Sequence, residues 1–265
     1  MTNFWGFVYG TLLSAMPVII AGIGALISQK AGVLNVATEG LILAGAFAAA
    51  ATGLATGSSL LALLAGAMAG LLVVQLHSIF SIRMRANIFI VGLGINLLME
   101  GGIPLISRSL LSSSGVIRLD AGFSGSLLDT ITALFLTLFF LAFSIFLLNH
   151  SRWGLEITAA GSQRELLQRR GVSPERRQIG ALCISGITAG IAGALLILRI
   201  GAYAPGMSAG RGWIALAAVF LGFQRPLGVA AGALLFGLTD AIAGSLQIFP
   251  NLPSGLLMTL PYIIT

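Results

Sequence analysis

Three carboxylates lie inside long apolar runs of the sequence, where ionisable side chains are rare. They are Glu39, Glu100 and Asp240. A charged residue at the centre of a membrane-spanning helix costs about 2.5 to 3.5 kcal/mol of insertion free energy, so it normally faces a cavity, a partner or the interior of a helix bundle. Such residues often mark substrate and ion pathways. We therefore treat all three as candidate functional residues.

Two of these carboxylates follow an asparagine by four residues. Asn35 precedes Glu39, and Asn96 precedes Glu100. Residues four apart share one face of a helix, so each pair would form a polar stripe. We expect the two stripes to converge on a translocation path. The alternative is that the carboxylates satisfy free backbone groups of broken helices, or pair with Arg and Lys.

Enzyme chemistry finds little support in the sequence. Residues 206–210 read Gly-Met-Ser-Ala-Gly and match the G-x-S-x-G pattern of serine hydrolases. That chemistry needs a histidine beside the serine, but His77 and His150 are expected near the cytoplasmic ends of their helices and Ser208 near the outer side. A glycine-rich turn is the better interpretation. The sequence also has no metal-ligand spacing and no phosphate-binding loop. We expect no catalytic residue, metal or cofactor, and any ATP chemistry must come from another chain.

The composition determines which elements must position these groups. The chain has 265 residues, of which 57% are hydrophobic and 8% charged, and its mean hydropathy is +1.02. So few polar groups could not cover the surface of a soluble domain. Continuous apolar runs of about 20 residues favour helices over a membrane β-barrel. We expect an all-α, polytopic membrane protein with one transmembrane domain over residues 1–265. The net charge of +6 is assigned to cytoplasmic loops and not to nucleic-acid binding.

Hydropathy divides the chain into about eight full spans and a short C-terminal apolar piece. The final piece, after Pro253, holds only about a dozen residues and is too short to cross the bilayer. The eight spans are expected at about 7–27, 35–55, 59–80, 88–106, 128–148, 179–200, 213–223 and 226–246.

The polar run from Ser151 to Arg177 orients these spans. It holds six of the fourteen basic residues, and the positive-inside tendency places it in the cytoplasm. The resulting alternation puts ten basic residues inside and four outside, with the N-terminus outside. The four on the outer side are Arg108, Arg118, Arg199 and Arg211.

Local signals indicate a short helix within this run. Ser162 and Glu165 have the spacing of a capping box, and Gly171 is placed to end the helix. Ser173 followed by Pro174 indicates the start of another helix. We expect a cytoplasmic helix at about Gln163–Arg170. The alternative is a solvated loop whose arginines only set the topology.

Small residues recur four apart at Gly6/Gly10, Gly66/Gly70, Gly186/Gly190 and Gly228/Gly232. In lipid such pairs allow close approach of helix backbones, so they predict a tightly packed bundle. Two glycine-interrupted segments, Lys30–Gly45 and Arg199–Val219, fall in opposite halves of the chain and on opposite sides of the membrane. This is the pattern of an inverted repeat with broken helices near a central pathway.

Four blocks of the sequence occur in a fixed order. They are SQKAGVLNVATEG at 28–40, RMRAN at 83–87 with GLGIN at 92–96, residues 154–161 with GV at 171–172, and GRGWIALAA at 210–218 with RPLG at 225–228. Together they resemble the permease subunits of bacterial ABC importers for branched-chain amino acids, simple sugars and nucleosides. The resemblance covers about Ala21 to Ala241, and the first and last blocks look most like the nucleoside-type branch.

This resemblance implies a subunit of a larger machine in the bacterial inner membrane. A second permease, identical or not, would form the other half of the path, cytoplasmic ATPases would drive transport, and an extracytoplasmic binding protein would deliver the substrate. The implied ATPase-coupling residues are Gly161, Arg164, Glu165, Leu166, Arg169 and Gly171. The expected substrate path comprises Asn35, Glu39, Asn96, Glu100, Trp213 and Asp240.

The sequence departs from the family pattern at two places. Ala37-Thr38 stands where a glycine and an apolar residue are usual, and the C-terminus lacks the usual final stretch. A nucleoside is the expected substrate, with sugar and branched-chain amino acid as alternatives. A facilitator or channel, or an intramembrane enzyme, is the alternative from another class.

Overall fold

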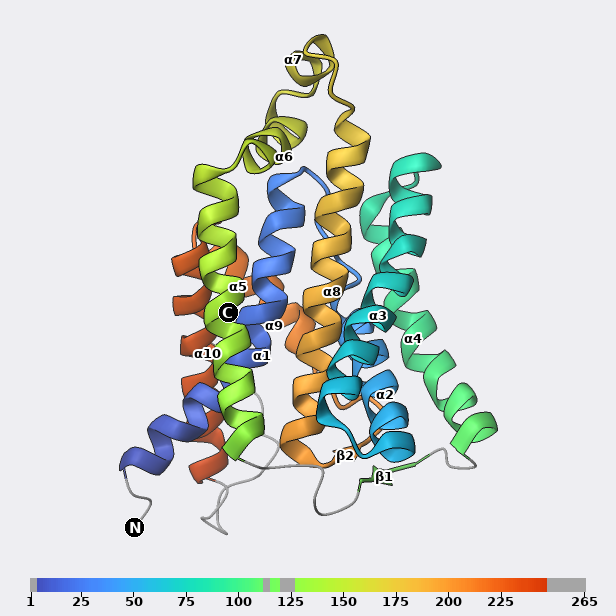
Figure 1. The fold of residues 1–265 in the computed structure, drawn as a ribbon, viewed down its shortest axis with the longest axis vertical. Coiled ribbons are helices and arrows are strands. Elements are labelled where there is room, and N and C mark those ends of the chain that lie inside the picture. The colour runs from blue at the N-terminus through green and yellow to red at the C-terminus, as the bar shows by residue number, and fades with distance from the viewer. Residues whose placement is uncertain (1–3, 112–114, 120–126, 247–265) are drawn as a thin grey trace.

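The computed structural model describes residues 4–111, 115–119 and 127–246 (Figure 1). The chain forms long helices that run side by side, with short elements at the two ends of the bundle. In chain order the elements are α1 (Phe4–Lys30), α2 (Thr38–Thr56), α3 (Ser59–Ser78), the π-helical turn η1 (Ile79–Arg83), α4 (Ile88–Leu111), β1 (Ile117–Arg118), α5 (Leu127–His150), α6 (Arg152–Ser162), α7 (Arg164–Arg169), α8 (Pro174–Ile200), β2 (Ala202–Tyr203), α9 (Arg211–Leu221) and α10 (Pro226–Leu246).

The prediction of an all-α polytopic membrane protein is confirmed. Seven helices in the described part of the chain are long and apolar enough to cross a membrane. The structure differs at the segment expected to be the seventh of eight spans. There α9 has only 11 residues, about 16 Å at 1.5 Å per residue, which is about half the thickness of the hydrocarbon core. The predicted C-terminal apolar piece lies outside the described residues.

Helix α8 forms the centre of the bundle, where it packs against α1, α2 and α3. Three of its glycines, Gly186, Gly190 and Gly193, lie directly against backbone atoms of α3 and α2, and a Cβ atom at any of them would overlap those atoms. Two of the predicted small-residue pairs therefore meet each other, because Gly186/Gly190 faces Gly66/Gly70 on α3. The pair at Gly6/Gly10 makes no such contact, since a Cβ there would meet no atom within 4 Å.

One end of the bundle carries α6 and α7, and we call it the α7 end (Figure 1). The predicted helix at Gln163–Arg170 is present as α7, and Gly171 with a φ of 75° follows it in the left-handed conformation. Ser173 caps α8, with Pro174 in the first turn, as predicted. The predicted capping box is wrong. Ser162 is the last residue of α6, where its hydroxyl donates to the carbonyl oxygen of Thr158 at 2.9 Å.

The opposite end carries the two short strands and is called the β1 end. Strand β1 pairs antiparallel with β2, with Ile117 opposite Tyr203. This pairing joins the chain after α4 to the chain after α8. Tyr203 is buried and packs edge-on against Phe47, with ring centroids 5.6 Å apart, and burial raises the pKa of its phenol to about 12.

Candidate functional site

The chain between α1 and α2, residues 31–37, is a non-helical segment that runs back along α8. At its start, the amide of Gln178 donates to the carbonyl oxygen of Ala31 at 3.1 Å. Further along, the amide of Asn35 donates to the hydroxyl of Ser185 at 2.9 Å. Ser185 lies 11 residues into α8, so Asn35 lies about 16 Å along that helix from its start, and α2 begins three residues later at Thr38. The N-terminus of α2 is thus inside the bundle.

The N-terminus of α9 meets the N-terminus of α2 at the carboxylate of Glu39. Oε1 of Glu39 accepts hydrogen bonds from the hydroxyl of Ser208 at 2.5 Å and from the backbone N–H of Gly210 at 2.8 Å. Oε2 accepts from the backbone N–H of Gly212 at 2.6 Å. The first N–H groups of a helix have no partner inside the helix and attract negative charge. Glu39 therefore acts as the cap of α9, as in the alternative that the sequence left open.

The glycines around this junction allow the close approach. Gly210 has a φ of 80° in the left-handed region, and a Cβ at Gly212 would overlap the backbone of Glu39. Ala37 and Thr38, where the sequence departs from the expected family pattern, are fully buried, and the hydroxyl of Thr38 donates to the carbonyl oxygen of Asn35.

Asn96 fixes α4 to the same junction. Its Nδ2 donates to the carbonyl oxygen of Val36 at 3.0 Å, and its Oδ1 accepts from the backbone N–H of Gly40 at 2.8 Å. Gly92, one turn earlier on α4, lies so close to Val36 that a Cβ would overlap it. The Asn96 side chain thus satisfies two backbone groups at the break between α1 and α2, the carbonyl of Val36 and the N–H of Gly40.

A cavity of about 410 Å³ opens beside the junction. Four of the six residues predicted for the substrate path line it: Glu39, Asn96, Glu100 and Trp213. The remaining lining is apolar or glycine-rich apart from Ser208, and it includes no Arg or Lys. A volume in this range fits a small-molecule ligand.

The other two predicted path residues lie elsewhere. Asn35 is fully buried against Ser185 and does not line the cavity. Asp240 lines a separate cavity of about 560 Å³ between α1, α9 and α10, together with Arg199 and Arg211. The structure therefore brings four of the candidates together and separates two.

In the part of the chain that the structure describes, Ser208 is paired with Glu39 and not with a histidine. The residue is 1% exposed, and its hydroxyl donates to Glu39. His77 is in hydrogen-bond range of the carbonyl oxygen of Ile88, at 3.4 Å, where α3 approaches α4 near the α7 end. Within residues 4–111, 115–119 and 127–246, no three His, Cys, Asp or Glu side chains come together as a metal site.

The predicted ATPase-coupling residues lie at the α7 end. Helix α7 exposes Arg164, Glu165, Leu166 and Arg169, whereas Leu167 is buried beneath them. Gly161, at the end of α6, lies directly against the backbone of residues 30–32. Leu167 was not among the predicted residues, although an apolar residue inside a polar run is the signal that could have identified it.

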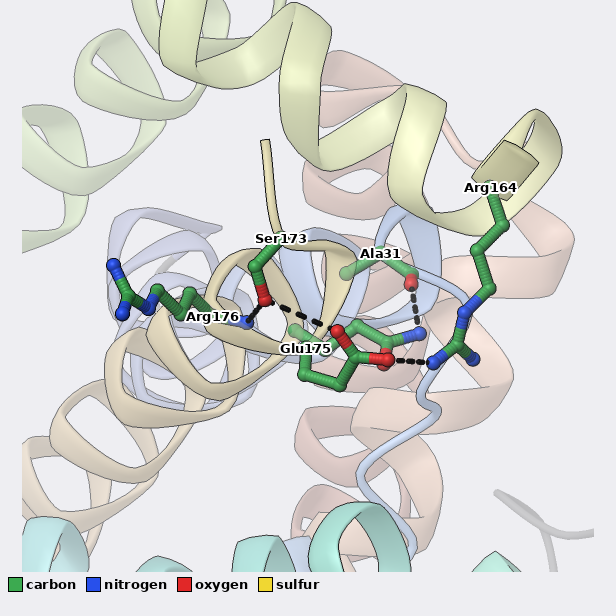
Figure 2. Close-up of polar contacts among 6 residues, drawn as sticks. Ala31, Arg164, Ser173, Glu175 and Arg176 are labelled. Carbon is green, nitrogen blue, oxygen red and sulfur yellow. Dashed lines mark hydrogen bonds and ion pairs between the residues drawn. The ribbon is translucent and has the colours of Figure 1, made fainter. Parts of the chain in front are cut away.

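Figure 2 shows how α7 is connected to the core. Arg164 forms an ion pair with Glu175 in the first turn of α8, and Glu175 also accepts from the hydroxyl of Ser173 at 3.0 Å. One turn later in α8, the amide of Gln178 donates to the carbonyl oxygen of Ala31, where the non-helical segment between α1 and α2 begins. A chain of contacts therefore leads from α7 to the segment that ends at Glu39. Sequence reasoning missed Glu175 and Gln178, whose partners are far away in the chain.

A second polar cavity, of about 1060 Å³, lies beside this connection. Its lining includes Arg83 at the end of η1, Arg85 in the turn before α4, and Arg164, Glu175 and Gln178.

Comparison with known proteins gives one family and several relatives. The model of the family described as "Branched-chain amino acid transport system / permease component" matches residues 7–265. TsgC13 of Haloferax volcanii, provisionally named a glucose ABC transporter permease protein, is 33% identical over 94% of this chain and 81% of its own length. No solved structure matches the chain at a significant level.

Two further relatives have names that refer to nucleosides. The nucleoside ABC transporter permease protein NupC of Lactococcus lactis is 26% identical, and the guanosine ABC transporter permease protein NupQ of Bacillus subtilis is 27% identical. Each match covers 96% of this chain and 88% of the relative.

Proposed function

Because the chain belongs to the permease component family of branched-chain amino acid transport systems, we propose that it is one permease subunit of an ATP-driven importer for nucleosides. Its substrate path passes through the cavity lined by Glu39, Asn96, Glu100 and Trp213. The chain supplies half of the path, and a second permease, identical or not, supplies the other half.

One observation carries this proposal. The helices α2 and α9 each begin inside the bundle after a non-helical segment, and their N-termini meet beside a polar cavity. Non-helical backbone at membrane depth is stable only where protein buries it or where it lines a water-filled space. The non-helical segments before α2 and before α9 both end at this cavity. In secondary transporters, interrupted helices of this kind commonly form the substrate site.

The lining of the cavity favours a neutral substrate over an amino acid. An amino acid needs a donor for its carboxylate, and a helix N-terminus is the usual candidate. Here the N-terminal amides of α9 are already occupied by Glu39, and no Arg or Lys lines the cavity. A nucleoside carries no charge at neutral pH, and the names of NupC and NupQ point to the same substrate class.

A simple sugar is the second candidate. The relative named for glucose has 33% identity with this chain, and sugars are neutral as well. The argument from the cavity applies to both classes, and the uptake experiment below distinguishes them.

Coupling to ATP hydrolysis takes place at α7, which docks on a separate cytoplasmic ATPase. The exposed Arg164, Glu165, Leu166 and Arg169 form the contact, and Gly161 and Gly171 bound the moving segment. Motion of α7 passes through the Arg164–Glu175 pair and the Gln178–Ala31 hydrogen bond to the segment that ends at Glu39.

The complex resides in the bacterial inner membrane, with the 151–177 loop in the cytoplasm. An extracytoplasmic binding protein delivers the substrate at the β1 end. There the antiparallel pairing of Ile117 with Tyr203 holds two surface segments together.

Uptake by the reconstituted complex tests this function. The permease pair and its ATPase are placed in proteoliposomes with the binding protein, and uptake of radiolabelled uridine, glucose and leucine is measured with and without ATP. We expect ATP-dependent uptake of uridine. Glucose uptake without uridine uptake would select the second candidate, leucine uptake would refute the argument from the cavity, and uptake without ATP would indicate a facilitator.

A further inference from the structure

Glu100 differs from Glu39 and Asn96 in the 410 Å³ cavity because no group among the described residues pairs with its carboxylate. Both oxygens of Glu39 accept hydrogen bonds, and both ends of the Asn96 amide are engaged. Within the part of the chain that the structure describes, Glu100 forms no hydrogen bond or ion pair, and its side chain is exposed to the cavity.

The position of Glu100 makes this feature unusual. It lies 12 residues into α4, a helix of 24 residues, and is therefore near the middle of a membrane span. Intramembrane carboxylates are usually paired with another side chain or with backbone groups. An unpartnered carboxylate in a lined cavity is suited to receive donors from a ligand.

Trp213 supplies the complementary surface. It follows the capped N-terminus of α9, is 43% exposed, and lines the same cavity as Glu100. Its position is set by Glu39, because the backbone N–H of the preceding residue, Gly212, is bonded to that carboxylate. An indole ring offers a flat apolar face for packing against a ring of the ligand.

We propose that Glu100 determines specificity by accepting hydrogen bonds from two neighbouring hydroxyl groups of the transported ligand, while Trp213 packs against its ring. This inference rests on the proposed function. A carboxylate has two oxygens that can accept two O–H donors side by side, and such charge-assisted bonds are shorter and stronger than neutral ones. The ligand class is a neutral ring compound with vicinal hydroxyls, such as a ribonucleoside.

A comparison of matched ligands tests this role. Uptake of uridine and of 2′,3′-dideoxyuridine, which lacks both ribose hydroxyls, is measured for the wild-type complex and for Glu100→Gln and Glu100→Asp. The same binding protein is used throughout, so its own preference cancels when the uridine-to-dideoxyuridine ratio is compared between variants. We expect Glu100→Gln to lower uridine uptake about tenfold, the effect of losing one charge-assisted bond, and to leave dideoxyuridine uptake within about twofold.

The controls separate specificity from folding. Glu100→Asp keeps the charge and should restore part of the ratio. Glu156→Gln makes the same chemical change on α6, away from the cavity, and should leave the ratio at the wild-type value. An equal loss of both ligands in Glu100→Gln, or no loss of either, would overturn the assignment, whereas ATP-dependent uridine uptake by the wild type would still support the proposed function.

Discussion

At the residue scale, the carboxylate of Glu39 holds the start of α9 against the start of α2. It accepts from Ser208, Gly210 and Gly212 and so satisfies two backbone N–H groups at the start of α9. Glu39→Ala would leave two backbone amides without an acceptor, and each buried unsatisfied group costs about 1 to 3 kcal/mol. We expect the purified variant to unfold at a clearly lower temperature than wild type. Glu39→Gln keeps one acceptor oxygen and should lie between the two.

Ser208→Ala is the matched control for this experiment. It removes one donor to Glu39 but leaves both backbone amides capped, so its unfolding temperature should stay near that of wild type. If Glu39→Ala abolished uptake without lowering the unfolding temperature, the carboxylate would act on the substrate and not as a helix cap.

The sequence identified these residues but not their partners. Glu39, Asn96 and Glu100 stood out because polar groups are rare in apolar runs. The donors to Glu39 lie 169 to 173 residues later in the chain, and the partner of Asn35 lies 150 residues later. No local spacing encodes contacts of this kind. Only the fold shows that Glu39 and Asn96 are hydrogen-bonded, whereas Glu100 has no partner among the described residues.

At the element scale, an ion pair between Arg164 of α7 and Glu175 of α8 links α7 to the bundle, and mutation can exchange the two charges. Arg164 and Glu175 have side chains that are 50% and 39% exposed, so their pair contributes about 1 kcal/mol or less to stability. We expect Arg164→Glu to leave folding intact, because little stability is lost, but to lower the uptake per ATP hydrolysed, since α7 then repels the start of α8.

The charge swap decides whether the pair itself matters. Arg164→Glu combined with Glu175→Arg restores an attractive pair and should recover much of the ratio of uptake to ATP hydrolysis. A separate variant, Glu165→Arg, reverses the charge of a residue that is exposed on α7. It tests the proposed contact with the ATPase independently of the Arg164–Glu175 pair. A double swap that stays as uncoupled as Arg164→Glu alone would contradict transmission through Glu175.

The helix interface between α8 and α3 gives a second prediction at this scale. A Cβ at Gly190 would overlap backbone atoms of Gly66, so Gly190→Ala should force the two helices apart. Overpacking of this kind typically costs about 1 to 3 kcal/mol. Gly10→Ala is the matched control, because a Cβ there meets nothing within 4 Å and alanine favours the helix by up to about 1 kcal/mol. In thermal unfolding, Gly190→Ala should lower the unfolding temperature and Gly10→Ala should raise it slightly.

The sequence predicted helix ends correctly where the residues that form the cap lie next to one another in the chain. Ser173 with Pro174 and the glycine at 171 marked real helix ends. The capping box failed because Ser162 bonds back to Thr158 inside α6. Helix α6 itself was missed, although Ser151 accepts from the N–H of Gly154 as its cap, because it follows the apolar α5 after a single residue. Hydropathy counted α9 as a span because apolar content does not record whether a helix starts at the surface or halfway in.

At the scale of the whole molecule, two similar units run in opposite directions. In each unit a long helix, α1 or α8, is followed by a non-helical segment and then by a helix that starts inside the bundle, α2 or α9. The two inner helices begin at the same carboxylate. This agrees with the inverted repeat expected from the glycine-interrupted segments. It also explains why the cavity lies between the halves, because each half contributes one interrupted backbone.

This arrangement predicts which side of the membrane each connection occupies. Cys183 is the only cysteine, so Cys183→Ser gives a background into which single cysteines can be placed. Val116, beside β1, and Gln168, on α7, are both exposed and lie at opposite ends of the bundle. A membrane-impermeant maleimide should modify Val116→Cys in intact spheroplasts and Gln168→Cys only in inside-out vesicles.

A cysteine at Phe223 tests whether α9 turns back toward the α7 end, because Phe223 follows α9 and is 86% exposed. The chain leaves α8 at the β1 end and, if α9 runs back toward the α7 end, Phe223→Cys must react from the same side as Gln168→Cys. Gly22 in α1 lies against both Ala215 and Val229, which places the turn between α9 and α10 toward the end of α1 that adjoins α6. Reaction of Phe223→Cys from the Val116 side would show that α9 does not turn back. The junction at Glu39 could not then form, because Gly210 and Gly212 would no longer reach it from inside the bundle.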